Sequence, residues 1–78
     1  MHVVAEKKWS YVLFDDGNGW ILTYLIGGVV EVDVSVRLAE QERDLIKADP
    51  ANVDKLVERM KQHRRDFASR EINPPVWP

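Results

Sequence analysis

Residues 21–37, ILTYLIGGVVEVDVSVR, decide the fold, because two runs of β-forming residues lie on either side of a Gly-Gly pair. Glycine adopts positive φ angles without steric cost, and a two-residue type I′ turn needs them at both central positions. The pair Gly27-Gly28 therefore predicts a β-hairpin in which Ile26 opposes Val29. Successive side chains of a strand point to opposite faces, so this register assigns every residue of the hairpin to one of two faces.

The register predicts one aliphatic face, which is suited to packing beneath helices, and one mixed face. The aliphatic face is expected to carry Ile21, Thr23, Leu25, Val30, Val32, Val34 and Val36. The mixed face is expected to carry Trp20, Leu22, Tyr24 and Ile26 beside Val29, Glu31, Asp33, Ser35 and Arg37. What covers this mixed face is the main question about the fold.

A further strand is predicted upstream, at residues 8–14 (KWSYVLF), and the DDGNG sequence after it predicts a hairpin loop. If Phe14 opposes Trp20, then Phe14 lies on the mixed face and Trp9 on the aliphatic face. The three predicted strands, residues 8–14, 20–26 and 29–37, form an antiparallel meander with the second strand in its centre.

Two helices are predicted after the strands, at residues 38–48 and 50–70, because apolar residues recur there at helical spacing. The pair Asp49-Pro50 suits the start of the second helix, since Asp caps helices and proline fits their first turn. Residues 71–78, rich in proline, predict an extended tail. The expected fold is therefore α+β: a single domain, residues 1–78, in which a C-terminal helical hairpin packs on one face of a three-stranded antiparallel meander.

Composition limits the kind of protein that this chain can be. The 78 residues include no cysteine, which excludes disulfides and thiolate metal sites and favours a reducing, cytoplasmic compartment. No uncharged apolar run reaches the roughly 18 residues of a membrane span, and the N-terminus lacks the pattern of a signal peptide. The net charge of −2 argues against sequence-independent binding of nucleic acid. We therefore expect neither a membrane nor a nucleic acid as partner.

No residue pattern predicts catalysis, a cofactor or a metal site. The sequence DDGNGW matches the middle of a calcium-binding loop, but Phe14 and Leu25 occupy positions where carboxylate ligands are required. His2 lies near the terminus and His63 beside the apolar stripe of the second helix, so a shared metal would require coincidence. We therefore expect a non-catalytic protein.

The mixed face is the best candidate for function, because its aromatic and aliphatic residues would form an exposed apolar patch with an acidic border. We predict that the chain is a small protein-interaction module that forms a homodimer through this face. A further predicted contact lies where the longer helix extends past the shorter one. The predicted interface residues are Phe14, Trp20, Leu22, Tyr24, Glu31 and Asp33 on the face, and Arg64 and Phe67 on the helix.

Three alternatives stay open from the sequence. The tail could fold back over the mixed face, which would then need no partner. The chain could be a small acidic inhibitor, of the immunity-protein or antitoxin kind, that binds a basic enzyme through Tyr24, Glu31 and Asp33. It could also be a small enzyme or a cofactor-binding subunit with a pocket near His63, Arg64 or Tyr24.

Overall fold

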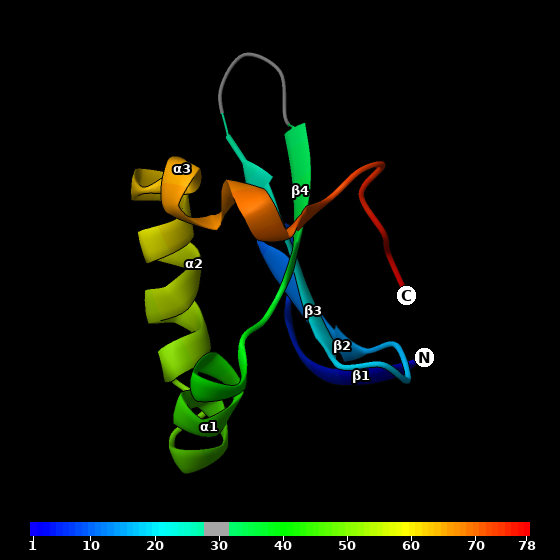
Figure 1. The fold of residues 1–78 in the computed structure, drawn as a ribbon. Coiled ribbons are helices and arrows are strands. Elements are labelled where there is room, and N and C mark those ends of the chain that lie inside the picture. Colours follow the sequence, from blue (N-terminus) through cyan, green and yellow to red (C-terminus); the bar gives the residue numbers. More distant parts are fainter. Residues whose placement is uncertain (28–31) are drawn as a thin grey trace.

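The computed structural model of the chain describes residues 1–27 and 32–78 and has an α+β fold (Figure 1). Antiparallel strands form one five-stranded sheet whose strand order follows the sequence. The strands are β1 (His2–Lys7), β2 (Tyr11–Asp15), β3 (Trp20–Ile26), β4 (Val32–Arg37) and β5 (Glu71–Ile72). The predicted α+β class and antiparallel sheet are confirmed, but the prediction of three strands was wrong.

The prediction missed β1 and β5, the strands at the two edges of the sheet. Residues 8–10 form a turn between β1 and β2, so the strand predicted at residues 8–14 begins only at Tyr11. At the other edge, Ile72 of β5 pairs with Ser35 of β4. The strand β5 has only two residues, so its sequence contains no alternation to detect. Its conformation depends on the strand with which it pairs.

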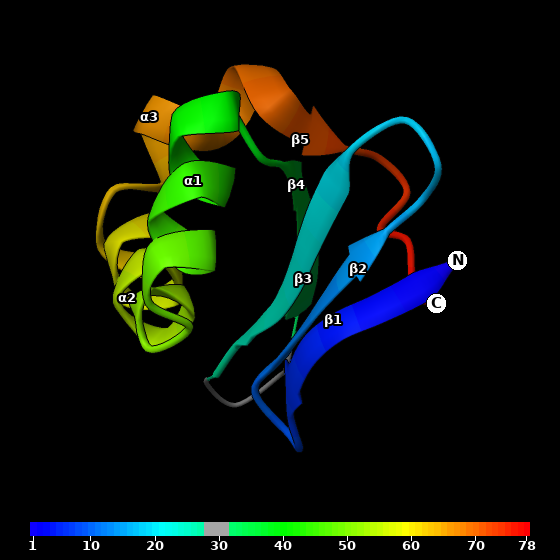
Figure 2. The same cartoon turned by 90° about the horizontal axis from the view of Figure 1, so that it is seen from below.

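Two helices of the chain, α1 and α2, pack on one face of the sheet (Figure 2). The helical elements are α1 (Glu40–Ala48), α2 (Asn52–Gln62), α3 (Arg64–Phe67) and a 3-10 turn (Ala68–Arg70). The predicted helix at residues 50–70 is therefore not continuous. It breaks at His63, whose φ of −129° and ψ of 48° are not helical. The break turns the chain back towards the sheet, so Phe67 is buried instead of projecting past α1 as predicted.

The register between β3 and β4 differs from the predicted register by three residues. Ile26 pairs with Val32, not with Val29, and Leu22 pairs with Val36. Because three is an odd number, the shift exchanges the two faces of β3 relative to β4. Gly28, the second residue of the predicted turn, lies outside the described residues, as do residues 29–31, the start of the predicted third strand.

Burial of large side chains explains the observed register. The core beneath the helices contains Tyr11, Leu13, Leu22, Tyr24, Val34, Val36, Leu38, Ile46, Val53, Val57, Met60 and Phe67. Pairing Leu22 and Tyr24 with the valines of β4 puts leucine and tyrosine beneath the helices, where the predicted register would have put Thr23. Burial of these side chains beneath the helices removes apolar surface from water, and the hydrophobic contribution to stability grows with that area. Thr23 and Ser35 consequently lie on the second face of the sheet, which points away from the helices.

Candidate functional site

The second face of the sheet is partly covered by the tail, which we define as residues 73–78 (Figure 2). The backbone of Val76 holds the tail in place: its N–H donates to Ser35 Oγ over 2.8 Å, and its carbonyl accepts from Thr23 Oγ1 over 2.6 Å. Thr23 and Ser35 are directly opposite each other on β3 and β4, and both side chains are buried. The tail therefore covers part of the sheet face that points away from the helices.

The hydrogen bonds around Val76 form a closed ring. The two hydroxyl oxygens of Thr23 and Ser35 lie 2.6 Å apart, and each hydroxyl has one proton to donate. The Val76 N–H donates to Ser35 Oγ, and the Val76 carbonyl lies 2.6 Å from Thr23 Oγ1 and 3.2 Å from Ser35 Oγ. When the Thr23 hydroxyl donates to this carbonyl, the Ser35 hydroxyl is free to donate to Thr23. Both backbone groups and both hydroxyls are satisfied in this arrangement, as buried polar groups need to be. The ring thus fixes the tail at one position on the sheet.

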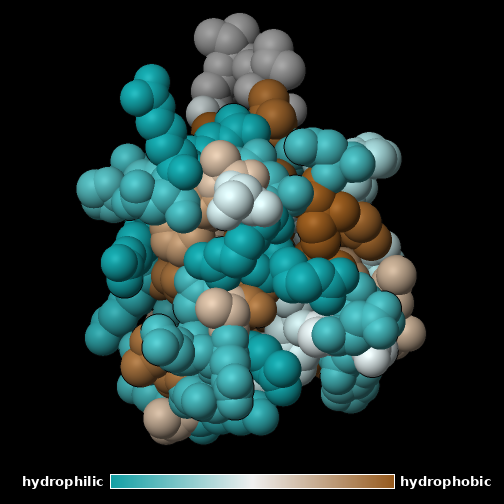
Figure 3. Space-filling view, in the orientation of Figure 1, coloured by the Kyte–Doolittle hydropathy of each residue, from teal (hydrophilic) through white to brown (hydrophobic). Residues whose placement is uncertain are grey.

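Trp77 follows this ring and is partly exposed. Its indole N–H donates to Asp33 Oδ2 over 2.8 Å, while 42% of the residue's surface remains accessible. Figure 3 shows apolar residues on the side of the molecule where the tail lies, with mostly hydrophilic residues over the helices. The hydrogen bond from Trp77 engages the Asp33 carboxylate within the chain and fixes the orientation of the indole.

A groove of about 460 Å³ lies between Trp77 and the turn that joins β1 to β2. The sheet residues Val12 and Leu25 give it an apolar floor, and Trp9 also lines it. Charged side chains around it include Glu6 and Lys8. We call this surface the tryptophan groove. An apolar depression with two indoles and a few charged groups has the composition of a binding site.

Trp9 is unusual in both its exposure and its backbone. It is 80% exposed, and its φ of 65° lies in the left-handed region. The Ser10 N–H donates to the Lys7 carbonyl over 3.0 Å, so Trp9 is the third residue of a four-residue turn. A positive φ at this position is the mark of a type II turn, in which glycine is the usual residue. The turn therefore presents a large indole to solvent at a position where a side chain costs backbone energy.

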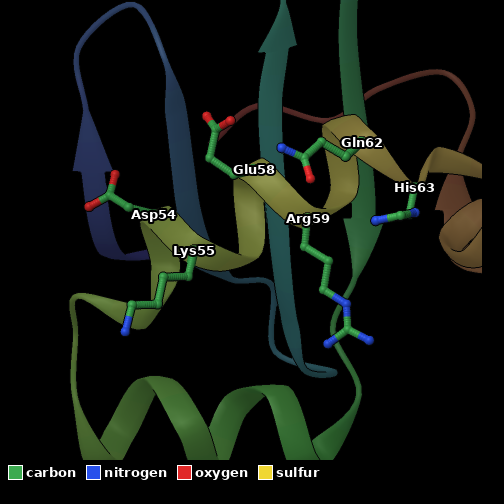
Figure 4. A pocket seen from close by; sticks show the side chains of 6 residues that line it. All are labelled: Asp54, Lys55, Glu58, Arg59, Gln62 and His63. Atoms are coloured by element: carbon green, nitrogen blue, oxygen red, sulfur yellow. The ribbon is translucent and has the colours of Figure 1, made fainter.

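A second, larger hollow of about 530 Å³ lies along α2 (Figure 4). Its lining residues are Asp54, Lys55, Glu58, Arg59, Gln62 and His63. Figure 4 shows that these side chains spread in different directions and do not point to a common centre. All six are exposed or half-exposed polar residues of one helix and the residue that follows it, and charges of both signs alternate among them. We therefore take the tryptophan groove as the candidate site, because its apolar floor gives a ligand surface to bury.

The predicted interface residues do not form one exposed patch. Phe14, Leu22 and Tyr24 are fully buried, and Phe67 is 5% exposed. Leu22 and Tyr24 are buried because the three-residue shift of register turns their side chains towards the helices. Phe14 pairs with Val3 of β1, a strand that was not predicted.

The other predicted interface residues lie apart from one another. Trp20 is partly exposed, and the cationic groups of Arg43 and Lys47 lie 5.5 Å and 5.7 Å from the centre of its ring. Arg64 donates to Glu71 over 3.1 Å, which links α3 to β5. Glu31 lies outside the described residues. Trp9 was not predicted as a site residue, because tryptophan favours strands and residues 8–14 were predicted as one.

The carboxyl groups with shifted pKa values hold elements of the fold together. Hydrogen bonds from Arg37 and from the backbone N–H of Asn18 lower the pKa of Asp16 to about 2. Burial acts to raise the pKa of Glu42, but the hydrogen bonds from Arg70 outweigh it and the pKa is lowered. A carboxylate that is ionised at all pH values near neutrality is a poor general acid or base. These groups are therefore structural ion-pair partners.

Comparison of the chain with protein-family models, with curated proteins and with solved structures finds no match. Among the described residues, no group of three or more His, Asp or Glu side chains is placed to hold a metal ion. Within residues 1–27 and 32–78, no helix is both long enough and apolar enough to cross a membrane.

Proposed function

We propose that the protein is a small non-catalytic protein-interaction module, and that it forms a homodimer through the tryptophan groove. The observation that carries this proposal is Trp9, an 80% exposed indole held at a φ of 65° beside an apolar depression. Tryptophan is enriched among the residues that dominate binding energy at protein interfaces. A left-handed residue with a side chain costs about 1–2 kcal/mol, and strain of this kind is concentrated at functional sites.

The tryptophan groove has both a projecting side chain, Trp9, and an apolar depression that can receive the Trp9 of a second copy. In a two-fold dimer each copy uses the same surface, so that surface must be complementary to itself. The exposed indole of Trp9 can enter the groove of the second copy, between the floor residues Val12 and Leu25 and the indole of Trp77. The patch also carries both signs of charge, so Glu6 of one copy can pair with Lys8 of the other.

The area available indicates a weak dimer. A buried aromatic side chain contributes about 150–250 Å², so two tryptophans from each copy contribute at most about 600–1,000 Å². Stable specific interfaces bury about 1,200–2,000 Å². We therefore expect a dissociation constant in the range of about 1 μM to 1 mM.

Sedimentation velocity over a dilution series from about 10 μM to 1 mM tests the proposal directly. The wild-type chain is expected to shift from monomer to dimer, whereas Trp9→Ala is expected to stay monomeric. Leu45→Ala is the matched control, because Leu45 is also an exposed apolar residue, at 60%, but lies on α1. A wild-type chain that is monomeric throughout, or a Trp9→Ala variant that dimerises as the wild type does, would contradict the proposal.

We do not extend the proposal to an acidic inhibitor or an enzyme. The inhibitor hypothesis relied on Tyr24, Glu31 and Asp33. Tyr24 is buried, Asp33 accepts a hydrogen bond from Trp77, and Glu31 lies outside the described residues. The enzyme hypothesis required a pocket where His63, Arg64 or Tyr24 converge. His63 lies on the α2 hollow, while Arg64 is paired with Glu71.

A further inference from the structure

We infer that the tail, residues 73–78, is a strap that assembles the tryptophan groove, and that the groove is complete only while Val76 is docked on Thr23 and Ser35. The inference rests on the proposed function, because dimerisation is one of its readouts. It makes Thr23 and Ser35 positioning residues: neither lines the groove, yet both decide whether its Trp77 side is present.

Ser35 attaches the chain at two successive points. Its backbone pairs with Ile72 of β5, at the edge of the sheet, while its side-chain oxygen accepts from the Val76 N–H on the second face. The three residues between, Asn73-Pro74-Pro75, must therefore carry the chain from the sheet edge onto the face. Proline restricts the backbone, so two prolines in this short segment reduce the number of undocked conformations and favour docking.

The tail can leave its position without opening the main core. The core cluster beneath the helices has no member from residues 73–78 among the residues described. The hydrogen bonds that hold Val76 join its backbone to two hydroxyls, and water can replace these bonds once the tail has left. Docking of the tail is therefore a local equilibrium, separate from unfolding of the domain.

Undocking removes one side of the groove. Trp77 is the residue next to Val76, and its indole is oriented by the hydrogen bond to Asp33. When Val76 leaves the ring of hydroxyls, Trp77 loses the anchor beside it, and the groove keeps Trp9, Val12 and Leu25 but not the second indole. Dimerisation and tail docking are thereby linked: each is expected to favour the other by the same factor.

The double variant Thr23→Val/Ser35→Ala tests this inference, because it removes both hydroxyls and leaves Trp9 and Trp77 in the chain. Hydrogen exchange of the Val76 amide reports docking, and sedimentation velocity reports the dimer. We expect fast exchange at Val76 and a dimer at least about tenfold weaker than the wild-type dimer, with the helical circular dichroism unchanged. The single variant Thr23→Ser is the control. It keeps both hydroxyls, so its Val76 amide is expected to exchange as slowly as in the wild type.

Each other outcome has a definite meaning. An exposed Val76 amide with an unchanged dimer would overturn the strap while leaving the proposed function intact. A protected Val76 amide in the double variant would overturn the assignment of Thr23 and Ser35 as the docking residues. A wild-type chain that never dimerises would instead refute the proposed function, and Val76 exchange would still test docking. If the double variant does not fold, Val76→Pro decides, because it removes the donor N–H without changing the sheet. Docking of this variant is followed by hydrogen exchange of the Trp77 indole N–H, which donates to Asp33 in the docked tail.

Discussion

The strain at Trp9 leads to a prediction about two variants of one residue, Trp9→Ala and Trp9→Gly. Both variants remove the indole, so both lose the same side-chain contacts and the same cation–π neighbour, Lys8, whose Nζ lies 5.8 Å from the ring centre. They differ only in the Cβ atom at a backbone position with a φ of 65°. The difference in stability between them therefore isolates the strain that a side chain causes at this turn.

The magnitude follows from two opposing effects. A left-handed conformation costs a residue with a Cβ atom about 1–2 kcal/mol, and glycine avoids this cost. Glycine also gives the unfolded chain more freedom, which offsets about 0.5–1 kcal/mol of that gain. Trp9→Gly should therefore be more stable than Trp9→Ala by about 0.5–1 kcal/mol. For a domain of this size, that corresponds to a Tm higher by about 3–6 °C.

Urea unfolding and thermal unfolding, both followed by circular dichroism, measure this difference. Dilute protein is used so that self-association does not contribute to the stability of either variant. Both variants are expected to be equally monomeric in sedimentation velocity. If Trp9→Ala were as stable as Trp9→Gly, the positive φ at residue 9 would not destabilise the chain. Backbone strain would then no longer support the tryptophan groove as a binding site.

Three further predictions concern the fold. Tyr24→Phe is expected to keep or slightly raise the free energy of unfolding in urea, because the buried Tyr24 hydroxyl has no hydrogen-bond partner among the described residues. Glu42→Ala is expected to lower that free energy by about 2 kcal/mol, since Glu42 accepts from the backbone N–H of Ala39, the N-cap residue of α1, and pairs with Arg70. Asp16 has a folded pKa of about 2, below its ordinary value of 3.8, so its bond to Arg37 stabilises the fold above pH 3.8 and is lost as the pH falls towards 2. Thermal unfolding between pH 5 and pH 2 should accordingly be less pH-dependent in Asp16→Asn than in the wild type, and equal slopes would contradict this account.

Some predictions based on local patterns agree with the structure. The strand β3 spans Trp20–Ile26, where apolar and β-branched residues are dense, and α1 ends at Ala48, just before the Asp49-Pro50 pair. These features follow from the conformational preferences of neighbouring residues, which act in any context. The α+β class follows from them as well, because it requires only the order and type of the elements.

The end of α2 and the position of Trp9 show where local patterns are insufficient. Residues 59–67 continue to show helical spacing, and no glycine or proline interrupts them, yet the helix breaks at His63. The break allows Phe67 to enter the core, which is a gain that only the packed structure supplies. Trp9 was assigned to a strand because tryptophan favours strands, but the pairing of β1 with β2 places it in the turn.

The sequence by itself determined that this chain has two-faced strands followed by helices, because alternation and helical spacing are properties of neighbouring residues. Only the tertiary structure decided which strand face lies under the helices, since both registers satisfy the alternation and burial of Leu22 and Tyr24 distinguishes them. The tertiary structure also decided what covers the other face. Val76 meets Thr23 and Ser35 across 53 and 41 residues of sequence, and contacts at such separations form only when the whole chain has folded.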